Sequence, residues 1–221
     1  MSGPIQPRSL AATIFLSPHE ARLRAGWRLL IQTLLMLVFS ILVSIIFAPL
    51  LLFAGGTSLL LVGEVTELIA FTASVFLARR WLDRRSIVSL GLRLEKQAWK
   101  DILAGIGITF AIMGLIFAAM SAIGWLTFEG FAWQTESAAQ TAGNALIFLL
   151  VFVLVGWNEE LLSRGYHLQS LASGIDPFWG VILSSAVFGI LHLSNPHATW
   201  VSAAGIFFAG LFLAYGYLRT R

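Results

Sequence analysis

The chain has 221 residues, of which 58% are hydrophobic and only 11% are charged, and its mean hydropathy is +0.85. Soluble domains carry about 25% charged residues, so this composition excludes a soluble globular protein and indicates an integral membrane protein. The sequence contains no Cys, which excludes disulfides, zinc–thiolate sites and thiol nucleophiles.

Six stretches are long and apolar enough to cross a bilayer, which takes about 20 residues. We therefore predict an all-α, multi-pass membrane helix bundle with about six transmembrane helices. The predicted spans are roughly 27–53, 59–79, 101–126, 144–173, 178–195 and 200–218.

The segment before the first span, residues 1–26, is predicted to be cytoplasmic and to contain a short interfacial helix. Ser17, Pro18 and Glu20 fit the N-cap, N1 and N3 positions of a capping box at its start. The first apolar run is too long for a signal peptide, so no cleaved leader is expected.

The positions of the basic residues indicate which ends of the helices face the cytoplasm. Of the 14 Lys and Arg residues, all except Arg164 lie before or at the start of the first span, between the second and third spans, or after the sixth. Positive charge marks the cytoplasmic side, so both termini are predicted to be cytoplasmic and no nucleic-acid partner is expected. Residues 27–100 are then two N-terminal transmembrane helices with a basic cytoplasmic loop, and residues 101–221 are a core of four transmembrane helices.

The fourth span contains a run of charges, in the stretch "VLVGWNEELLSRGYHLQSL" (residues 153–171). Leucines at helical spacing continue beyond the charges, and the first strong turn signal is Gly174 with Asp176 and Pro177. We therefore predict one continuous helix from about residue 144 to residue 173, followed by a fifth helix starting near residue 178.

Counting along these two helices brings Glu159 and His192 to the same depth. Each lies 14 residues from its predicted helix end at the turn, or about 21 Å at 1.5 Å per residue. An ionisable side chain at membrane depth costs about 2.5–3.5 kcal/mol or more, which favours a functional role for this pair.

The spacing also assigns roles. Glu160 and Arg164 stand four residues apart with the acid first, so they are predicted to form an ion pair on one helix face. Glu159 is rotated by about 100° from Glu160 and is left to face His192. With that imidazole beside it, its carboxylate could act as general base on a water molecule.

These motifs resemble those of the CAAX-protease and bacteriocin-processing family of intramembrane glutamate-type proteases. "EELLSRG" is similar to the family's EExxxR(G) motif, and "FGILHLSNP" is similar to its FxxxH motif followed by Asn-Pro. Phe207 and Gly210 fit an FxxG pattern, and the resemblance covers about residues 80–221.

The resemblance implies that Glu159 and His192 activate water for peptide hydrolysis, without a metal or another cofactor. Glu160 and Arg164 are carried over as motif residues. Asn195 either orients His192 or water, or merely forms the Asn-Pro turn. Glu64 and Glu67 are expected to be interfacial or helix-packing groups, and His167 a bundle-facing or snorkelling group.

One departure from the family pattern is the absence of its later HxxxN motif, which the family uses to stabilise the oxyanion. We expect the chain to be shortened at its C-terminus, after Arg221, and to have reduced activity for that reason. His197 is a poor substitute, because it follows His192 in a loop at the outer end of the helices.

The leading functional prediction is an intramembrane endopeptidase that cleaves a membrane-associated protein or peptide, with that substrate and the lipid bilayer as its partners. The principal alternative is a catalytically impaired member that acts as a membrane scaffold or bacteriocin-immunity-type factor. A metallopeptidase and a proton-coupled carrier are weaker alternatives, because HExxH and internal repeat symmetry are both absent.

Overall fold

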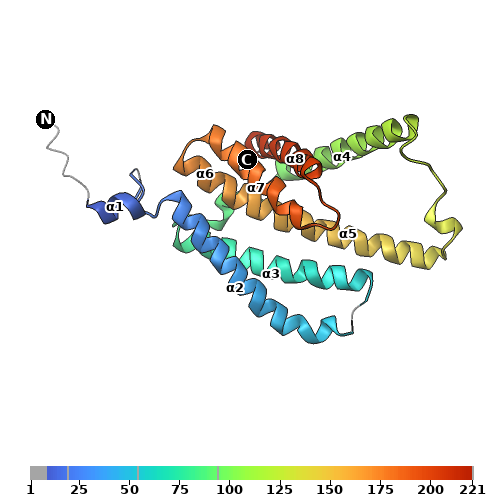
Figure 1. Cartoon of the computed structure of the whole chain (residues 1–221), viewed down its shortest axis with the longest axis horizontal. Coiled ribbons are helices and arrows are strands. Elements are labelled where there is room, and N and C mark those ends of the chain that lie inside the picture. Colours follow the sequence, from blue (N-terminus) through green and yellow to red (C-terminus); the bar gives the residue numbers. More distant parts are fainter. Residues whose placement is uncertain (1–8, 19, 54, 94, 221) are drawn as a thin grey trace. The chain divides into compact units, whose positions relative to one another are not determined.

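The computed structural model describes residues 9–18, 20–53, 55–93 and 95–220 (Figure 1). Six of its helices are long and apolar enough to cross a membrane, which confirms the predicted all-α, multi-pass bundle. The elements are α1 (Leu10–Phe15), α2 (Ala25–Leu51), α3 (Thr57–Trp81), η1 (Ile87–Leu90), α4 (Lys96–Ala122), η2 (Ala132–Gln134), α5 (Ala138–Glu160), η3 (Leu161–Leu168), α6 (Gln169–Gly174), α7 (Pro177–Leu191), η4 (His192–Ser194) and α8 (Trp200–Thr220).

The fourth span is continuous from Ala138 to Gly174, through α5, η3 and α6, as predicted from the position of the turn signal. It starts earlier than residue 144 because Ser137 caps a polar first turn, where its hydroxyl accepts a hydrogen bond from the Gln140 amide at 3.3 Å. The helix after the turn starts at Pro177, and Asp176 caps it by accepting from the Trp179 amide at 2.9 Å.

The predicted helix start at Ser17 is wrong. The short helix before the first span is α1, and its N-cap is Ser9, which accepts a hydrogen bond from the Ala12 amide at 3.2 Å. Ser17 lies after α1, within a turn closed by a bridge between Leu16 and Leu23. The acidic residue of a capping box can form ion pairs in place of the cap, and here Glu20 pairs with Arg22 and Arg85.

The contacts divide the chain into two compact units. The first comprises Met1–Gly91 and Leu150–Arg221, and the second comprises Leu92–Leu149. In the first unit α2 packs along α3, and α7 packs along α8. This unit holds all the predicted site residues, so the site can be described within it alone.

Two glycines let α7 and α8 approach closely. A Cβ atom at Gly189 would lie 2.7 Å from the carbonyl oxygen of Ala203, and one at Gly210 would lie 3.1 Å from the Cβ of Ser185. Small residues at such crossings are typical of membrane helix pairs. The close packing fixes the end of α7, where His192 follows.

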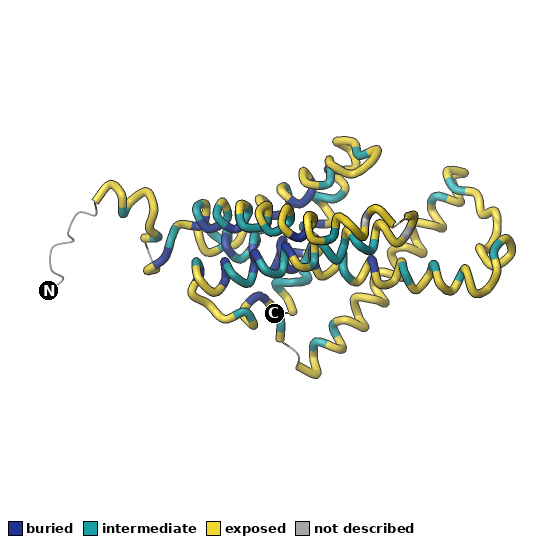
Figure 2. The backbone as a smooth tube through the Cα atoms, turned by 90° about the horizontal axis from the view of Figure 1, so that it is seen from below, coloured by how far each residue is buried: buried dark blue, intermediate teal, exposed yellow. Residues whose placement is uncertain are grey.

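Most large apolar side chains remain exposed in the chain by itself, and Figure 2 shows exposed residues along most of the helical surface. Helices that meet lipid keep such a surface, since lipid tails are as apolar as leucine. The buried residues, by contrast, include many polar ones, such as Gln32, Asn158 and Arg164. The interior of this bundle is therefore partly polar.

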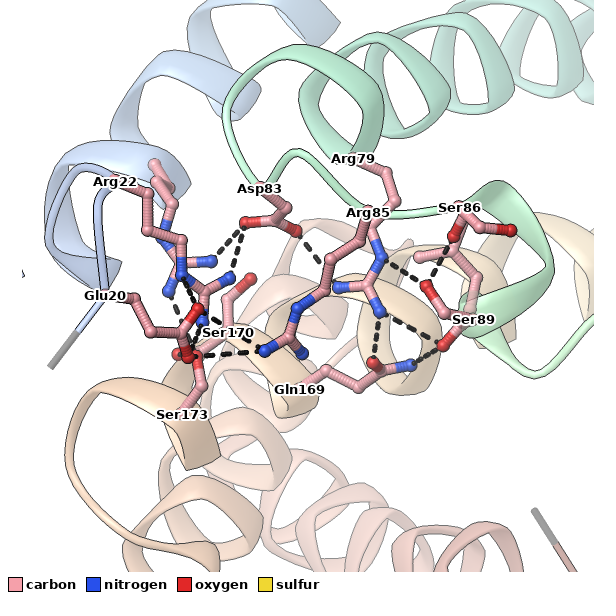
Figure 3. Close-up of polar contacts among 12 residues, drawn as sticks. Glu20, Arg22, Arg79, Asp83, Arg85, Ser86, Ser89, Gln169, Ser170 and Ser173 are labelled. Atoms are coloured by element: carbon pink, nitrogen blue, oxygen red, sulfur yellow. Dashed lines mark hydrogen bonds and ion pairs between the residues drawn. The ribbon is translucent and has the colours of Figure 1, made fainter.

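A group of charged residues joins the N-terminal segment to the end of α3, and we call it the Asp83 cluster. The Asp83 carboxylate is fully buried and pairs with Arg22 at 3.4 Å, with Arg79 at 3.0 Å and with Arg28 (Figure 3). The cluster comprises Glu20, Arg22, Arg28, Arg79, Asp83 and Arg85.

The Asp83 cluster also reaches α6, the end of the fourth span. Arg28 donates to the Ser173 hydroxyl at 3.0 Å, and Arg79 donates to the Gln169 side-chain oxygen at 2.7 Å. Burial, together with repulsion from Arg28 and Arg85, lowers the pKa of the Arg22 guanidinium, although Glu20 and Asp83 oppose this shift. The cluster thus ties three helices together at the end of the bundle that carries most of the basic residues.

Candidate active site

The predicted motif residues lie at a change in helix geometry. Glu159 and Glu160 end α5, and Arg164 lies in η3, which is π-helical from Leu161 to Leu168. Single π-helical turns within α-helices are frequent at functional sites. Seven of the eight residues of η3 are buried, so this segment forms the tightly packed base of the site.

The predicted ion pair between Glu160 and Arg164 is present, with Arg164 Nη1 2.9 Å from Glu160 Oε1. The Arg164 side chain is only 3% exposed. Its guanidinium also lies over the Phe188 ring, 4.3 Å from the centroid, and donates to the carbonyl oxygen of Gly210 at 3.4 Å. Arg164 therefore connects the fourth span to both α7 and α8.

Glu159 and His192 meet as the counting argument predicted. His192 Nε2 lies 3.4 Å from Glu159 Oε1, although the two residues come from different helices. The Glu159 side chain is 37% exposed and the His192 side chain 19% exposed. The pair is therefore within reach of a water molecule or a substrate, unlike the buried Arg164 beneath it.

Phe188 fixes the orientation of the imidazole. His192 Nδ1 lies 2.7 Å from the Phe188 carbonyl oxygen, and a carbonyl can only accept, so Nδ1 carries the proton and donates. The two rings also meet edge to face, with centroids 4.6 Å apart. In a neutral imidazole this leaves the lone pair of Nε2 directed at the Glu159 carboxylate.

Asn195 lies on the turn that follows His192. Its backbone N–H donates to the His192 carbonyl at 3.1 Å, and its side chain is exposed. Within the described residues that side chain makes no hydrogen bond to His192 or Glu159. His197 lies two residues further along, exposed and with a positive φ of 60°.

Asn158 was not among the residues predicted from the sequence, although it is only 1% exposed and directly precedes Glu159. Its Nδ2 donates to Glu64 on α3, both to the carboxylate oxygen Oε2 and to the main-chain oxygen, each at 3.3 Å. Glu64 is therefore a packing group, as expected, but it packs beside the site. The signal in the sequence was an amide side chain within the apolar part of the helix, directly before the motif.

His167 faces the bundle interior, in agreement with one of the two roles expected for it. Its Nε2 lies 3.2 Å from the Gln32 side-chain oxygen on α2, and Gln32 in turn donates to the Ser74 hydroxyl on α3 at 3.2 Å. This polar contact lies away from Glu159 and His192. It gives His167 a role in packing α2 and α3 against η3.

Glu159 and His192 bring two hydrogen-bond acceptors face to face, and a single proton can be shared between them. A carboxylate oxygen and the free Nε2 of a neutral imidazole face each other at 3.4 Å, and either can take a proton from water. In the described part of the chain, no three His, Asp or Glu side chains converge as a metal-ligand set would.

Comparison with known proteins gives one match. Residues 141–221 match the family model described as "Type II CAAX prenyl endopeptidase Rce1-like". No curated protein matches the chain, and no solved structure does so either. The matched segment contains the EExxxR and FxxxH motifs, so the predicted resemblance is confirmed there, while residues 80–140 lie outside the match.

Proposed function

With the segment 141–221 assigned to the Rce1-like CAAX prenyl endopeptidase family, we propose that the protein hydrolyses a peptide bond of a membrane-associated protein or peptide. We propose that Glu159 and His192 activate the attacking water. The observation that carries this proposal is the 3.4 Å contact between Glu159 Oε1 and His192 Nε2, made by two helices of a membrane bundle. Membrane spans hold such groups mainly for a function.

In the proposed reaction, Glu159 takes a proton from a water molecule that lies at the exposed side of the pair, within hydrogen-bond reach of its carboxylate. The resulting hydroxide adds to the scissile carbonyl carbon and forms a tetrahedral intermediate. When the C–N bond breaks, the protonated carboxyl of Glu159 returns its proton to the leaving amine. The products are a carboxylate and an amine, and no covalent enzyme intermediate forms.

Glu160 and Arg164 have a supporting role in this proposal. Arg164 is buried between Glu160, the Phe188 ring and the Gly210 carbonyl, so it holds the fourth span against α7 and α8. Phe188 is shared between the two pairs, because its ring contacts Arg164 while its carbonyl orients His192. A shift of Arg164 would therefore also move the imidazole.

The depth of the pair supports cleavage within the membrane. Glu159 lies 15 residues from Gly174 and His192 lies 15 residues from Pro177, which places both roughly 22 Å from that turn. The turn lies at the end of the bundle that holds the Asp83 cluster, and the hydrocarbon core is about 30 Å thick.

The proposed orientation places the Asp83 cluster and both termini on the cytoplasmic side, because basic residues mark that side. Glu159 and His192 then lie in the extracytoplasmic half of the bilayer. A topology reporter inserted at Gly130, between α4 and α5, should give an extracytoplasmic signal. A cytoplasmic signal would reverse the orientation.

Cleavage can be tested with purified protein in vesicles of phosphatidylethanolamine and phosphatidylglycerol. A library of membrane-tethered reporter peptides is added, and products are identified by mass spectrometry. Glu159→Ala and His192→Ala should each lower the rate by about 10²–10⁴-fold, the usual contribution of a general base. A chelator such as EDTA should leave the rate unchanged.

Gly205→Ala provides a matched control on α8, because a Cβ there meets no atom within 4 Å. Cleavage that persists in Glu159→Ala would refute the proposed mechanism. Peptide binding without cleavage by the unmodified chain would favour the scaffold or immunity-type alternative. Stoichiometric metal in elemental analysis, with loss of activity in EDTA, would favour a metallopeptidase.

A further inference from the structure

The two residues before Glu159 both hydrogen-bond to α3. Trp157 Nε1 donates to the Thr72 hydroxyl at 2.9 Å, and Asn158 Nδ2 donates to the carboxylate and main-chain oxygens of Glu64 at 3.3 Å. These contacts join residues 85 and 94 positions apart in the sequence. They attach the fourth span to α3 immediately before the catalytic motif.

Attachment at Asn158 sets the direction of Glu159. Neighbouring side chains on a helix are separated by about 100°, so a helix that holds Asn158 against α3 turns Glu159 away from α3. Asn158 is almost completely buried, and water cannot readily replace its partner. A small rotation or slide of this helix would lengthen the 3.4 Å contact between Glu159 and His192.

We propose that Asn158 and Glu64 are positioning residues that hold Glu159 against His192. Glu64 belongs to α3, outside the matched segment 141–221, so the N-terminal helices complete the site. Neither residue touches the reacting atoms in this proposal, and both act through Glu159. The inference rests on the proposed function, because it concerns the geometry of the same catalytic pair.

The kinetic test uses the best-cleaved peptide of the reporter library. Asn158→Ala and Glu64→Ala should each lower kcat by about tenfold to 10²-fold, because small displacements of catalytic groups have effects of this size, while KM stays nearly unchanged. Glu64→Gln keeps an oxygen that can accept from Asn158 but loses the charge, so it should recover most of the kcat lost in Glu64→Ala.

Thr66→Ala is the matched control on α3, because among the residues that the structure describes the Thr66 hydroxyl bonds only to Val62 of its own helix, at 2.9 Å. Its kcat should equal that of the unmodified protein. A loss of kcat in Glu64→Gln as large as in Glu64→Ala would show that the hydrogen bond between Asn158 and Glu64 does not position Glu159. Unchanged kcat in Asn158→Ala, in a protein that Glu159→Ala inactivates, would overturn the inference and leave the proposed function standing.

A second measurement does not depend on activity. The chain has no cysteine, so Glu159→Cys introduces a single thiol at the position in question. The rate at which a small maleimide modifies this thiol should change by at least about threefold when Asn158→Ala is added, because rates of thiol modification follow accessibility. It should not change with Thr66→Ala.

The thiol result separates the two proposals. Equal modification rates with and without Asn158→Ala would overturn the positioning role, whether or not any peptide is cleaved. A changed rate in a protein whose cleavage survives Glu159→Ala would support the positioning role and refute the proposed function.

Discussion

The bundle contains two groups of buried or half-buried charge that differ in how completely they are paired. In the Asp83 cluster one fully buried carboxylate pairs with three arginines, all of them buried. At the candidate active site Glu159 is 37% exposed and faces one imidazole at 3.4 Å. The Asp83 carboxylate is thus enclosed by cations, whereas the Glu159 carboxylate keeps an accessible side, as its proposed catalytic role requires.

The largest expected effect on stability comes from removing the central charge of the Asp83 cluster. Asp83→Asn removes the shared negative charge and leaves three buried guanidinium groups without it, which should lower the free energy of unfolding by about 3–5 kcal/mol. The unfolding can be followed by titration with sodium dodecyl sulfate. If Asp83→Asn unfolded at the same detergent fraction as the unmodified protein, the Asp83 carboxylate would not stabilise the fold, and the two regions would not differ in this respect.

The control for this variant is Glu20→Gln, which removes another carboxylate of the same cluster. The Glu20 side chain is 42% exposed, and half-exposed ion pairs contribute about 0–1 kcal/mol. Its effect should therefore be much smaller than that of Asp83→Asn.

A smaller effect is expected where α7 and α8 cross beneath His192. Gly189→Ala places a Cβ 2.7 Å from the Ala203 carbonyl oxygen, and overpacking of this kind costs about 1–3 kcal/mol. The helices should move apart, so the variant should lose stability in the same titration and also lose cleavage. Gly205→Ala, which meets open space, should lose neither, and equal behaviour of the two variants would contradict the packing argument.

The smallest effect on stability should come from a substitution at the candidate active site. Glu159→Gln removes a charge that is only partly paired, and we expect the free energy of unfolding to change by no more than about 0.5 kcal/mol. Thermal unfolding in detergent measures this change. A loss as large as that expected for Asp83→Asn would show that Glu159 is a structural charge, and the contrast between the two regions would disappear.

Much of the fold could be predicted because its signals are local. Apolar length located the six spans, and the turn signal at Gly174 and Pro177 gave the continuous fourth helix and the equal depth of Glu159 and His192. Spacing by four residues predicted the pair of Glu160 with Arg164. These inferences need only the rise and period of a helix.

The remainder depended on contacts between distant parts of the chain. Glu20 looked like a capping residue, but pairing with Arg22 and Arg85 binds it elsewhere. The partner of Asn158 lies 94 positions away on α3. Helical period and hydropathy do not determine which faces of two helices pack together, so these contacts could not be predicted from the sequence.

The proposed role of Glu159 as general base is tested most directly by measuring cleavage of one reporter peptide by Glu159→Gln in the same vesicles as the unmodified protein. Glutamine keeps the shape of the side chain and cannot act as a base. We expect loss of cleavage in a variant that unfolds at the same temperature as the unmodified protein. Cleavage at the unmodified rate would contradict it.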